Sequence, residues 1–128
     1  MTPEVERAVK AICESFVGAT ISAEEDGAGG AYALVDGVDL GPRFNPSKTW
    51  LGGHLTAQVP YSDVYPLFIG AEVRWADGRG FSAPLSLGHT FKGRAAIQVS
   101  RRSNRRDPKF ETPVAKFNKV LHWLRYEA

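Results

Sequence analysis

The sequence predicts an α+β fold in which an N-terminal helix, an antiparallel β-meander of about four strands and a C-terminal helix follow one another. Three observations predict it. Apolar residues recur with helical spacing in two segments, one near each end of the 128-residue chain. Between these segments the apolar period changes to two and turn residues multiply. The chain shows neither an internal repeat nor a linker, so residues 1–128 are expected to form a single domain.

The first expected element is an amphipathic helix over residues 3–17. Thr2 and Pro3 open it, because the threonine hydroxyl can accept a first-turn N–H and proline lacks a donor that would be unpaired there. The apolar residues of one face recur at offsets 4, 7 and 11: Val5, Val9, Ile12 and Phe16. Cys13 lies beside this stripe, late in the helix. We therefore expect a small buried hydrophobe there rather than a nucleophile.

The middle of the chain holds five strand candidates: 20–24, 32–36, 51–59, 68–75 and 95–99. The first two flank the Gly-rich loop 26–30 and are typical of a hairpin. The third is weakened by Gly52 and Gly53. Segment 68–75 shows the clearest alternation of apolar and other residues, and the turn residues Asp77 and Gly78 follow it.

A second amphipathic helix closes the chain. Thr112 and Pro113 open it in the same way as the first pair. Its apolar stripe recurs at offsets 3, 7 and 10: Val114, Phe117, Leu121 and Leu124. Its exposed face is expected to carry three cations: Lys116, Lys119 and Arg125.

The charge is divided between an acidic first part and a basic second part. Residues 1–91 hold 6 Lys and Arg against 11 Asp and Glu, whereas residues 92–128 hold 10 against 3. The densest segment has seven cations against Asp107 alone: Lys92, Arg94, Arg101, Arg102, Arg105, Arg106 and Lys109. These groups could bind phosphates or an acidic partner. The alternative is a solvated loop with arginines paired to carboxylates of residues 1–91, because no base-stacking aromatics alternate with the cations.

The sequence predicts no metal site and no cofactor. The three histidines, at 54, 89 and 122, are far apart, and no spacing typical of metal ligands joins them. The Gly-rich loop 26–30 lacks a lysine and precedes no helix, unlike a phosphate-binding loop.

The same composition bears on the compartment. A single cysteine excludes an intramolecular disulfide, and no stretch approaches the roughly 20 apolar residues of a membrane span. Near the N-terminus, Glu4, Glu6 and Arg7 stand where a signal peptide would be apolar. We therefore expect a cytoplasmic protein with no membrane partner.

Short motifs in a fixed order resemble the ubiquitin-conjugating-enzyme-like superfamily. In that family a Tyr-Pro pair follows the third strand, and a His-Pro-Asn segment and the catalytic cysteine come after it. Tyr65 and Pro66 match the pair. His89 stands where the His-Pro-Asn segment would begin, although Thr90 and Phe91 replace its proline and asparagine.

A bacterial branch of these proteins, the prokaryotic family E, is the more specific resemblance. Phe91-Lys92-Gly93 resembles its Phe-x-Gly, and Val99-Ser100-Arg101-Arg102 resembles its Trp-Ser-Arg-His-like run, with valine and arginine in place of tryptophan and histidine. The match covers roughly residues 55 to 125. The resemblance rests on short motifs at Gly93 and Ser100 as well as on Tyr65, Pro66 and His89.

What is missing determines what the resemblance implies. Thioester transfer requires a cysteine after His89, and residues 90–128 contain none. The resemblance therefore implies a non-catalytic binding or adaptor domain in a bacterial ubiquitin-like or defence pathway. Its partner would be a ubiquitin-like protein or another protein of a conjugation pathway. The expected partner-binding residues are Lys92, Arg94, Arg101, Arg102, Arg105 and Arg106.

Two other functions stay open. The basic segment 92–109 could belong to a nucleic-acid-binding module, whose affinity would fall steeply with salt. An enzyme could use His89 as a base, with Asp63 or Glu72 as its carboxylate partner.

Overall fold

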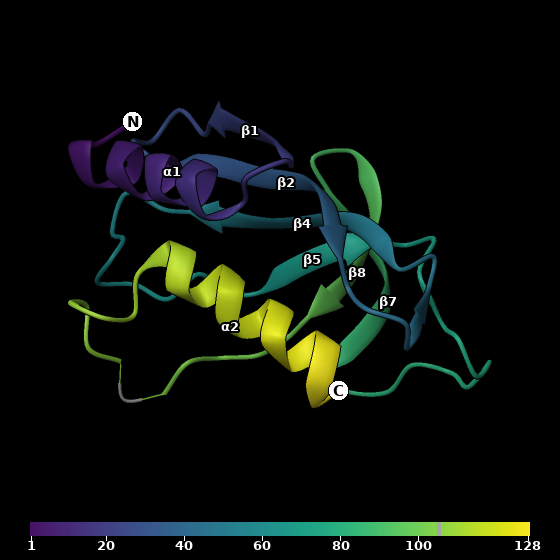
Figure 1. The fold of residues 1–128 in the computed structure, drawn as a ribbon. Coiled ribbons are helices and arrows are strands. Elements are labelled where there is room, and N and C mark those ends of the chain that lie inside the picture. Colours follow the sequence, from purple (N-terminus) through teal and green to yellow (C-terminus); the bar gives the residue numbers. More distant parts are fainter. Residues whose placement is uncertain (105) are drawn as a thin grey trace.

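The computed structural model describes residues 1–104 and 106–128, and it is an α+β fold with one helix near each end of the chain (Figure 1). This confirms the predicted class and the two helices. The elements are α1 (Pro3–Ser15), β1 (Thr20–Glu25), β2 (Ala31–Asp39), β3 (Phe44–Asn45), β4 (Lys48–Leu55), β5 (Leu67–Gly70), β6 (Arg74–Trp75), β7 (Leu85–Phe91), β8 (Arg94–Val99) and α2 (Pro113–Tyr126).

In the described residues, the strands form two antiparallel sheets. They outnumber the strands that the sequence predicts. The main sheet has six strands in the order β1-β2-β4-β5-β8-β7, and β3 pairs with β6 in a separate two-stranded sheet. The first four positions of the main sheet are the expected meander. The hairpin β7–β8 then extends it, with β8 beside β5.

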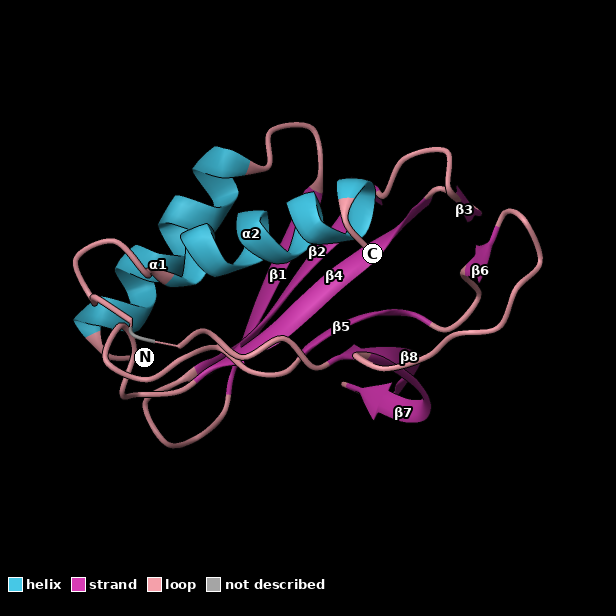
Figure 2. Ribbon diagram, turned by 90° about the horizontal axis from the view of Figure 1, so that it is seen from below, coloured by secondary structure: helices cyan, strands magenta, loops and turns pink. Residues whose placement is uncertain are grey.

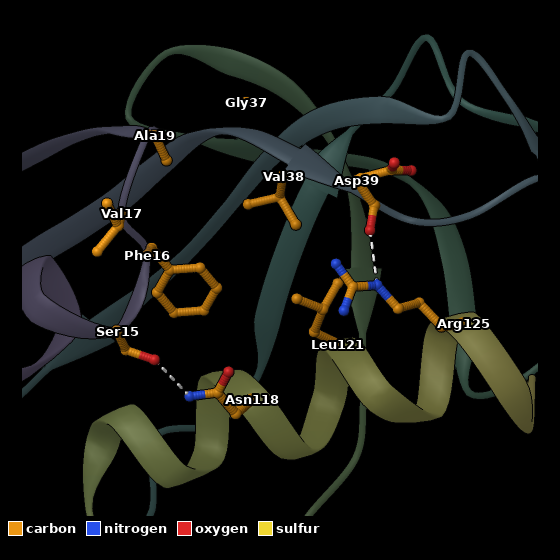
Figure 3. Close-up of a pocket in the computed structure, with 11 residues that line it drawn as sticks. Ser15, Phe16, Val17, Ala19, Gly37, Val38, Asp39, Asn118, Leu121 and Arg125 are labelled. Carbon is orange, nitrogen blue, oxygen red and sulfur yellow. Dashed lines mark hydrogen bonds between the residues drawn. The ribbon is translucent and has the colours of Figure 1, made fainter.

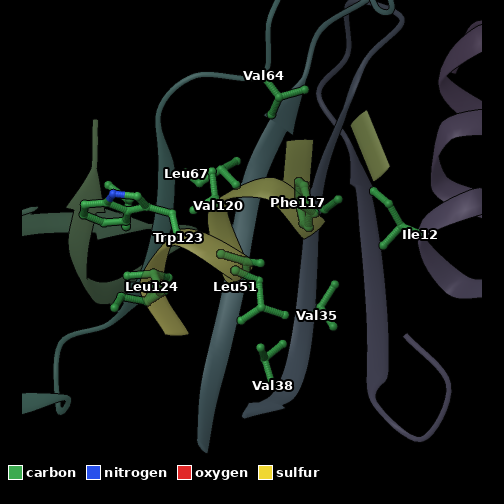
Figure 4. Close-up of a cluster of buried hydrophobic side chains, with 14 of the residues drawn as sticks. Ile12, Val35, Val38, Leu51, Val64, Leu67, Phe117, Val120, Trp123 and Leu124 are labelled. Atoms are coloured by element: carbon green, nitrogen blue, oxygen red, sulfur yellow. The ribbon is translucent and has the colours of Figure 1, made fainter. Parts of the chain in front are cut away.

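Both helices cover the same face of the main sheet (Figure 2). α1 contacts β1 and α2. Four fully buried side chains lie opposite one another in the register of the sheet: Val35, Leu51, Ile69 and Ile97. Ile12 of α1 and Phe117 of α2 belong to the same core (Figure 4). The core therefore joins both helices to four neighbouring strands.

The threonine caps form as predicted. The hydroxyl of Thr2 accepts the N–H of Val5 at 3.1 Å, and that of Thr112 accepts the N–H of Ala115 at 3.3 Å. Each helix begins at the proline that follows its cap. α1 ends at Ser15, two residues before the expected end.

The prediction of a buried Cys13 is wrong, because its side chain is exposed. The buried stripe of α1 consists of Val5, Ala8 and Ile12. One residue further along a helix turns the side chain by about 100°. Cys13 therefore faces solvent although it follows a fully buried residue.

The prediction of one strand over 68–75 is also wrong. β5 ends at Gly70, and the chain turns before Arg74 and Trp75 join the small sheet. At this turn the Thr49 hydroxyl donates to Oε1 of Glu72 at 2.7 Å and accepts the N–H of Gly70 at 3.2 Å. A side chain from another strand therefore closes the turn, and the local alternation does not reveal it.

β4 (Lys48–Leu55) differs from the predicted strand 51–59 at both ends. Its two glycines lie where neighbouring side chains leave no room for a Cβ atom. A Cβ on Gly52 would lie 2.6 Å from Cε2 of Phe91, and one on Gly53 would lie 2.5 Å from Cδ2 of Leu67. The two glycines let side chains lie against the backbone of β4 on both faces of the sheet.

The face without helices has a smaller cluster of its own, built around Phe91. Its members are Leu34, Trp50, Phe91 and Ala96, with Tyr32 and Phe68 packed against them. The ring of Phe91 stacks on Trp50 and on Phe68, with centroids 5.9 and 5.2 Å apart. Phe91 thereby fixes the end of β7 over the middle of the sheet.

β7 lies outside the predicted strands for two local reasons. Its register shifts between Ser86 and His89, where Gly88 has a φ of +83°, so alternation along the strand is broken. The turn to β8 has positive φ at both central residues, Lys92 at 50° and Gly93 at 77°. Such a turn usually carries Asn-Gly, and with lysine in place of asparagine the sequence does not indicate a hairpin turn here.

Candidate functional site

The basic segment does not form one surface. Lys92 and Arg94 lie at the turn of the β7–β8 hairpin, whereas Arg101, Arg102 and Arg106 follow β8 and lie near α2. The expected partner-binding residue Arg105 lies outside the described residues. The five expected residues that the structure describes are therefore divided between two regions.

At the hairpin, both cations are paired with carboxylates of β1 and β2. Nζ of Lys92 lies 3.1 Å from Oε2 of Glu24, and an Nη atom of Arg94 lies 3.6 Å from a carboxylate oxygen of Asp36. Lys92 also lies over the Tyr32 ring, at 4.6 Å from its centroid. The alternative of arginines paired with carboxylates of residues 1–91 therefore holds for Arg94, and Lys92 is paired in the same way.

Arg106 is tied into the fold. Its guanidinium donates to the carbonyl oxygens of Pro60, Tyr61 and Glu111, at 2.9, 2.9 and 2.6 Å. Its side chain is only 12% exposed. It joins the loop after β4 to the residues that precede α2, so its role is to hold two segments together.

Lys116 was expected on the exposed face of the last helix, and this prediction is wrong. It is 4% exposed, and its ammonium donates to Oδ2 of Asp63 at 3.0 Å, to the Ser103 hydroxyl at 2.9 Å and to the Arg101 carbonyl at 2.5 Å. Oδ2 of Asp63 also accepts the N–H of Ser103 at 2.8 Å. We call Asp63, Ser103, Arg106 and Lys116 the clamp.

Burial and charge have opposite effects within the clamp. Burial lowers the pKa of Lys116, while the hydrogen bond and the charge of Asp63 act to raise it. Arg106 also approaches this carboxylate, with its Nε 3.7 Å from Oδ1. One anion thus faces two cations.

Beside the clamp lies a small cavity of about 220 Å³, which we call the basic pocket. It is lined by Arg101, Arg102, Ser103, Asn104, Lys116, Lys119 and Val120. The guanidinium of Arg101 lies over the Trp123 ring, at 4.6 Å from its centroid, and that of Arg102 lies over the Tyr65 ring, at 4.2 Å. In residues 1–104 and 106–128, neither guanidinium has a carboxylate within ion-pair distance. The pocket therefore has an excess of positive charge.

Tyr65 and Pro66 lie between β4 and β5, the third and fourth strands of the meander, and their peptide bond is cis. Gly93 forms the β7–β8 turn with Lys92. Ser100 follows β8, where its N–H donates to the Pro84 carbonyl and its hydroxyl accepts from the Gln98 amide. These motif residues therefore shape the chain around β5 and β8.

His89 lies on β7, at the edge of the main sheet. Its Nε2 is 3.0 Å from the Ser86 hydroxyl. Asp63 belongs to the clamp, and Glu72 accepts from Thr49. Neither proposed carboxylate partner is therefore paired with His89, which removes the geometric basis of an enzyme built on those residues.

The sequence does not predict the pair that the carboxylate of Asp26 forms with the imidazole of His54. Oδ2 of Asp26 is 2.7 Å from Nε2 of His54, while its Oδ1 accepts the N–H groups of Ala28 and Gly30 at 2.7 and 2.9 Å. The His54 hydrogen bond, followed by that of Ala28, lowers the pKa of Asp26 to about 2. The Asp-Gly-rich composition of the loop was its only local signal. The pair orders the loop between β1 and β2.

In the described residues, two larger cavities lie where α1 approaches α2. One, of about 370 Å³, separates the end of α1 from α2, and Asn118 donates across it to Ser15 (Figure 3). On its other side Arg125 donates to the Asp39 carbonyl at 2.7 Å. The second, of about 400 Å³, lies between the start of α1 and the start of α2 and includes the exposed Tyr61. Neither lining contains a histidine or cysteine.

No protein-family model matches this chain, and neither a curated protein nor a solved structure matches it. Within residues 1–104 and 106–128, no three His, Cys, Asp or Glu side chains lie together as metal ligands would. The helices of that same part are too short or too polar to cross a membrane.

Proposed function

We propose that this chain is a non-catalytic, ubiquitin-conjugating-enzyme-like adaptor domain. Its partner would be a ubiquitin-like protein or another protein of a bacterial conjugation or defence pathway. The observation that supports the proposal most is the lack of a cysteine after Tyr65 and Pro66. This pair leads into β5 and the β7–β8 hairpin, and neither these strands nor the rest of the chain behind them contains a thiol.

Cys13 does not supply the missing thiolate. It is exposed on α1, which contacts β1 and α2, whereas His89 lies on β7 at the other edge of the sheet from β1. Thioester chemistry needs a nucleophile beside the groups that activate it. The sulfur lies on α1, which contacts β1, and the imidazole lies on the opposite edge strand, which favours binding over catalysis.

The proposed partner surface is the basic pocket, including Lys119, rather than the whole basic segment. Arg101 and Arg102 have no carboxylate partner in the described part of the chain, whereas Lys92 and Arg94 do. An acidic partner gains most from cations whose charge the domain itself leaves unpaired.

Binding of the full chain to the ubiquitin-like proteins encoded beside its gene, measured by calorimetry, tests the proposal. We expect a complex that weakens at least about tenfold in the Arg101→Glu/Arg102→Glu variant, since like charges across an interface repel. Arg94→Glu is the matched control and Cys13→Ser a second one; both should bind as the natural chain does. Absence of binding at high micromolar concentration by the folded chain, or a thioester that depends on Cys13, would contradict it.

A nucleic-acid-binding module is the second candidate, favoured by the same two unpaired arginines. Because Lys92 and Arg94 are paired elsewhere, the cations do not form one track along which a phosphate backbone could run. A gel shift at about 50 mM salt whose affinity falls steeply as salt rises would favour this candidate. Absence of a shift would leave the adaptor.

A further inference from the structure

The basic pocket has a net positive charge that the fold does not neutralise. Lys116 donates to Asp63, and Arg106 also faces this carboxylate, so the only acidic group of the clamp is shared by two cations. Outside the clamp, Lys119 is 4.0 Å from Glu111. Arg101 and Arg102 add two charges, and in the described residues neither has a carboxylate within ion-pair distance. Such a site attracts an anion.

The two arginines of this pocket are held in place before any ligand arrives. The segment that carries them is fixed at Arg101, whose carbonyl accepts from Lys116, and at Ser103, whose N–H donates to Asp63. The Cζ atoms of Arg101 and Arg102 lie over the rings of Trp123 and Tyr65, at 4.6 and 4.2 Å from the ring centroids. Stacking on an aromatic face leaves the N–H edges of a guanidinium free for hydrogen bonds. Side chains that are already ordered lose less conformational entropy when they bind a ligand.

The size and charge of the pocket point to one class of anion. At about 220 Å³ it is smaller than the roughly 300 to 1,000 Å³ of cavities that hold drug-sized ligands. A phosphate monoester carries close to two negative charges and three acceptor oxygens, whereas a carboxylate carries one charge and two oxygens. Two guanidinium groups and an ammonium match the former better.

We propose that the basic pocket binds a single phosphoryl group, either free phosphate or a phosphate monoester, through Arg101, Arg102 and Lys119. The inference uses side chains of the proposed partner surface but does not depend on the identity of that partner. Phosphate can therefore bind whether or not a ubiquitin-like protein does.

The test is a titration of the full ¹⁵N-labelled chain with inorganic phosphate at constant ionic strength, followed by NMR. Saturable shifts should centre on residues 101–104, Lys116 and Lys119, and acetate should bind at least about tenfold more weakly. Arg101→Ala/Arg102→Ala should weaken phosphate binding at least about tenfold, whereas Arg94→Ala should change it less than about twofold. O-Phosphoserine tests whether a monoester binds as free phosphate does; either ligand binding in the pocket supports the proposal.

Folding is controlled separately, because the guanidinium groups of both arginines lie over aromatic rings. The charge-preserving Arg101→Lys/Arg102→Lys variant keeps the field but loses the planar forks, and it should bind with intermediate affinity. Phosphate shifts that do not saturate, or that are equal in the alanine variant with an unchanged circular dichroism spectrum, would overturn the proposal. A single-stranded oligonucleotide that binds more tightly as it lengthens would overturn it in favour of a phosphodiester track.

Discussion

Two lysine–carboxylate pairs in this molecule have almost the same distance between nitrogen and oxygen but different exposure to solvent. Lys92 and Glu24 meet at 3.1 Å with side chains 33% and 68% exposed, while Lys116 and Asp63 meet at 3.0 Å with side chains 5% and 13% exposed. A pair in water contributes little because solvent screens it. In a buried pair, either partner left alone is costly. Distance alone therefore does not rank the two pairs.

The pairs also differ in what holds the segments they join. The hairpin that carries Lys92 is fixed by Phe91, whose ring lies against Gly52 and stacks on Phe68. The segment that carries Arg101 and Ser103 is fixed mainly by polar groups of the clamp. Packing thus organises one basic region, and hydrogen bonds to a buried ammonium organise the other.

The largest expected effect is at the clamp. Asp63→Ala leaves the Lys116 ammonium buried without its carboxylate, and we expect a loss of about 3 kcal/mol in the free energy of unfolding. Urea denaturation measures this change. The double variant Asp63→Leu/Lys116→Met should lose less than Asp63→Ala, because it removes both charges. A loss below about 1 kcal/mol for Asp63→Ala would make the clamp equivalent to a surface pair.

The next effect tests whether packing holds the hairpin. Gly52→Ala places a Cβ 2.6 Å from the Phe91 ring, so the ring or the strand must shift, and we expect a loss of about 1 to 3 kcal/mol. Gly80→Ala is the matched control: nothing lies within 4 Å of its added Cβ, and we expect a change within about 0.5 kcal/mol. Thermal unfolding of both variants measures the difference. Equal stabilities would show that Phe91 can move away at no cost.

The helices were predictable because their signals are local. Thr2 caps α1 and Thr112 caps α2, and each cap is followed by a proline. The predicted apolar stripes are buried in part, at Val5, Ile12, Phe117, Leu121 and Leu124. The clamp was not predictable, since Asp63 and Lys116 are 53 residues apart and a helical lysine in isolation is typical of an exposed face. The charge count found the basic segment, but only tertiary contacts separate Lys92 from Arg101.

A smaller effect concerns pH at the loop between β1 and β2. The pKa of Asp26 is lowered to about 2, so its contribution to stability is present above the ordinary value of 3.8 and is lost as the pH falls through about 2. His54→Ala removes the largest cause, and the pKa of Asp26 should move back toward 3.8. A carboxyl NMR titration of both proteins measures it. An unchanged titration would assign the shift to the Ala28 and Gly30 N–H groups instead.

The smallest effect is expected at the exposed pair. Glu24→Gln removes the charge partner of Lys92 but leaves its ammonium over the Tyr32 ring, so we expect a loss between 0 and about 1 kcal/mol. Screening gives a second criterion, because the difference between Glu24→Gln and the natural chain should shrink as salt rises to about 1 M. Unfolding in urea at low and high salt measures both. A salt-independent loss as large as that of Asp63→Ala would mean that the ion pair, rather than Phe91, fixes the hairpin, and the contrast between the two basic regions would fail.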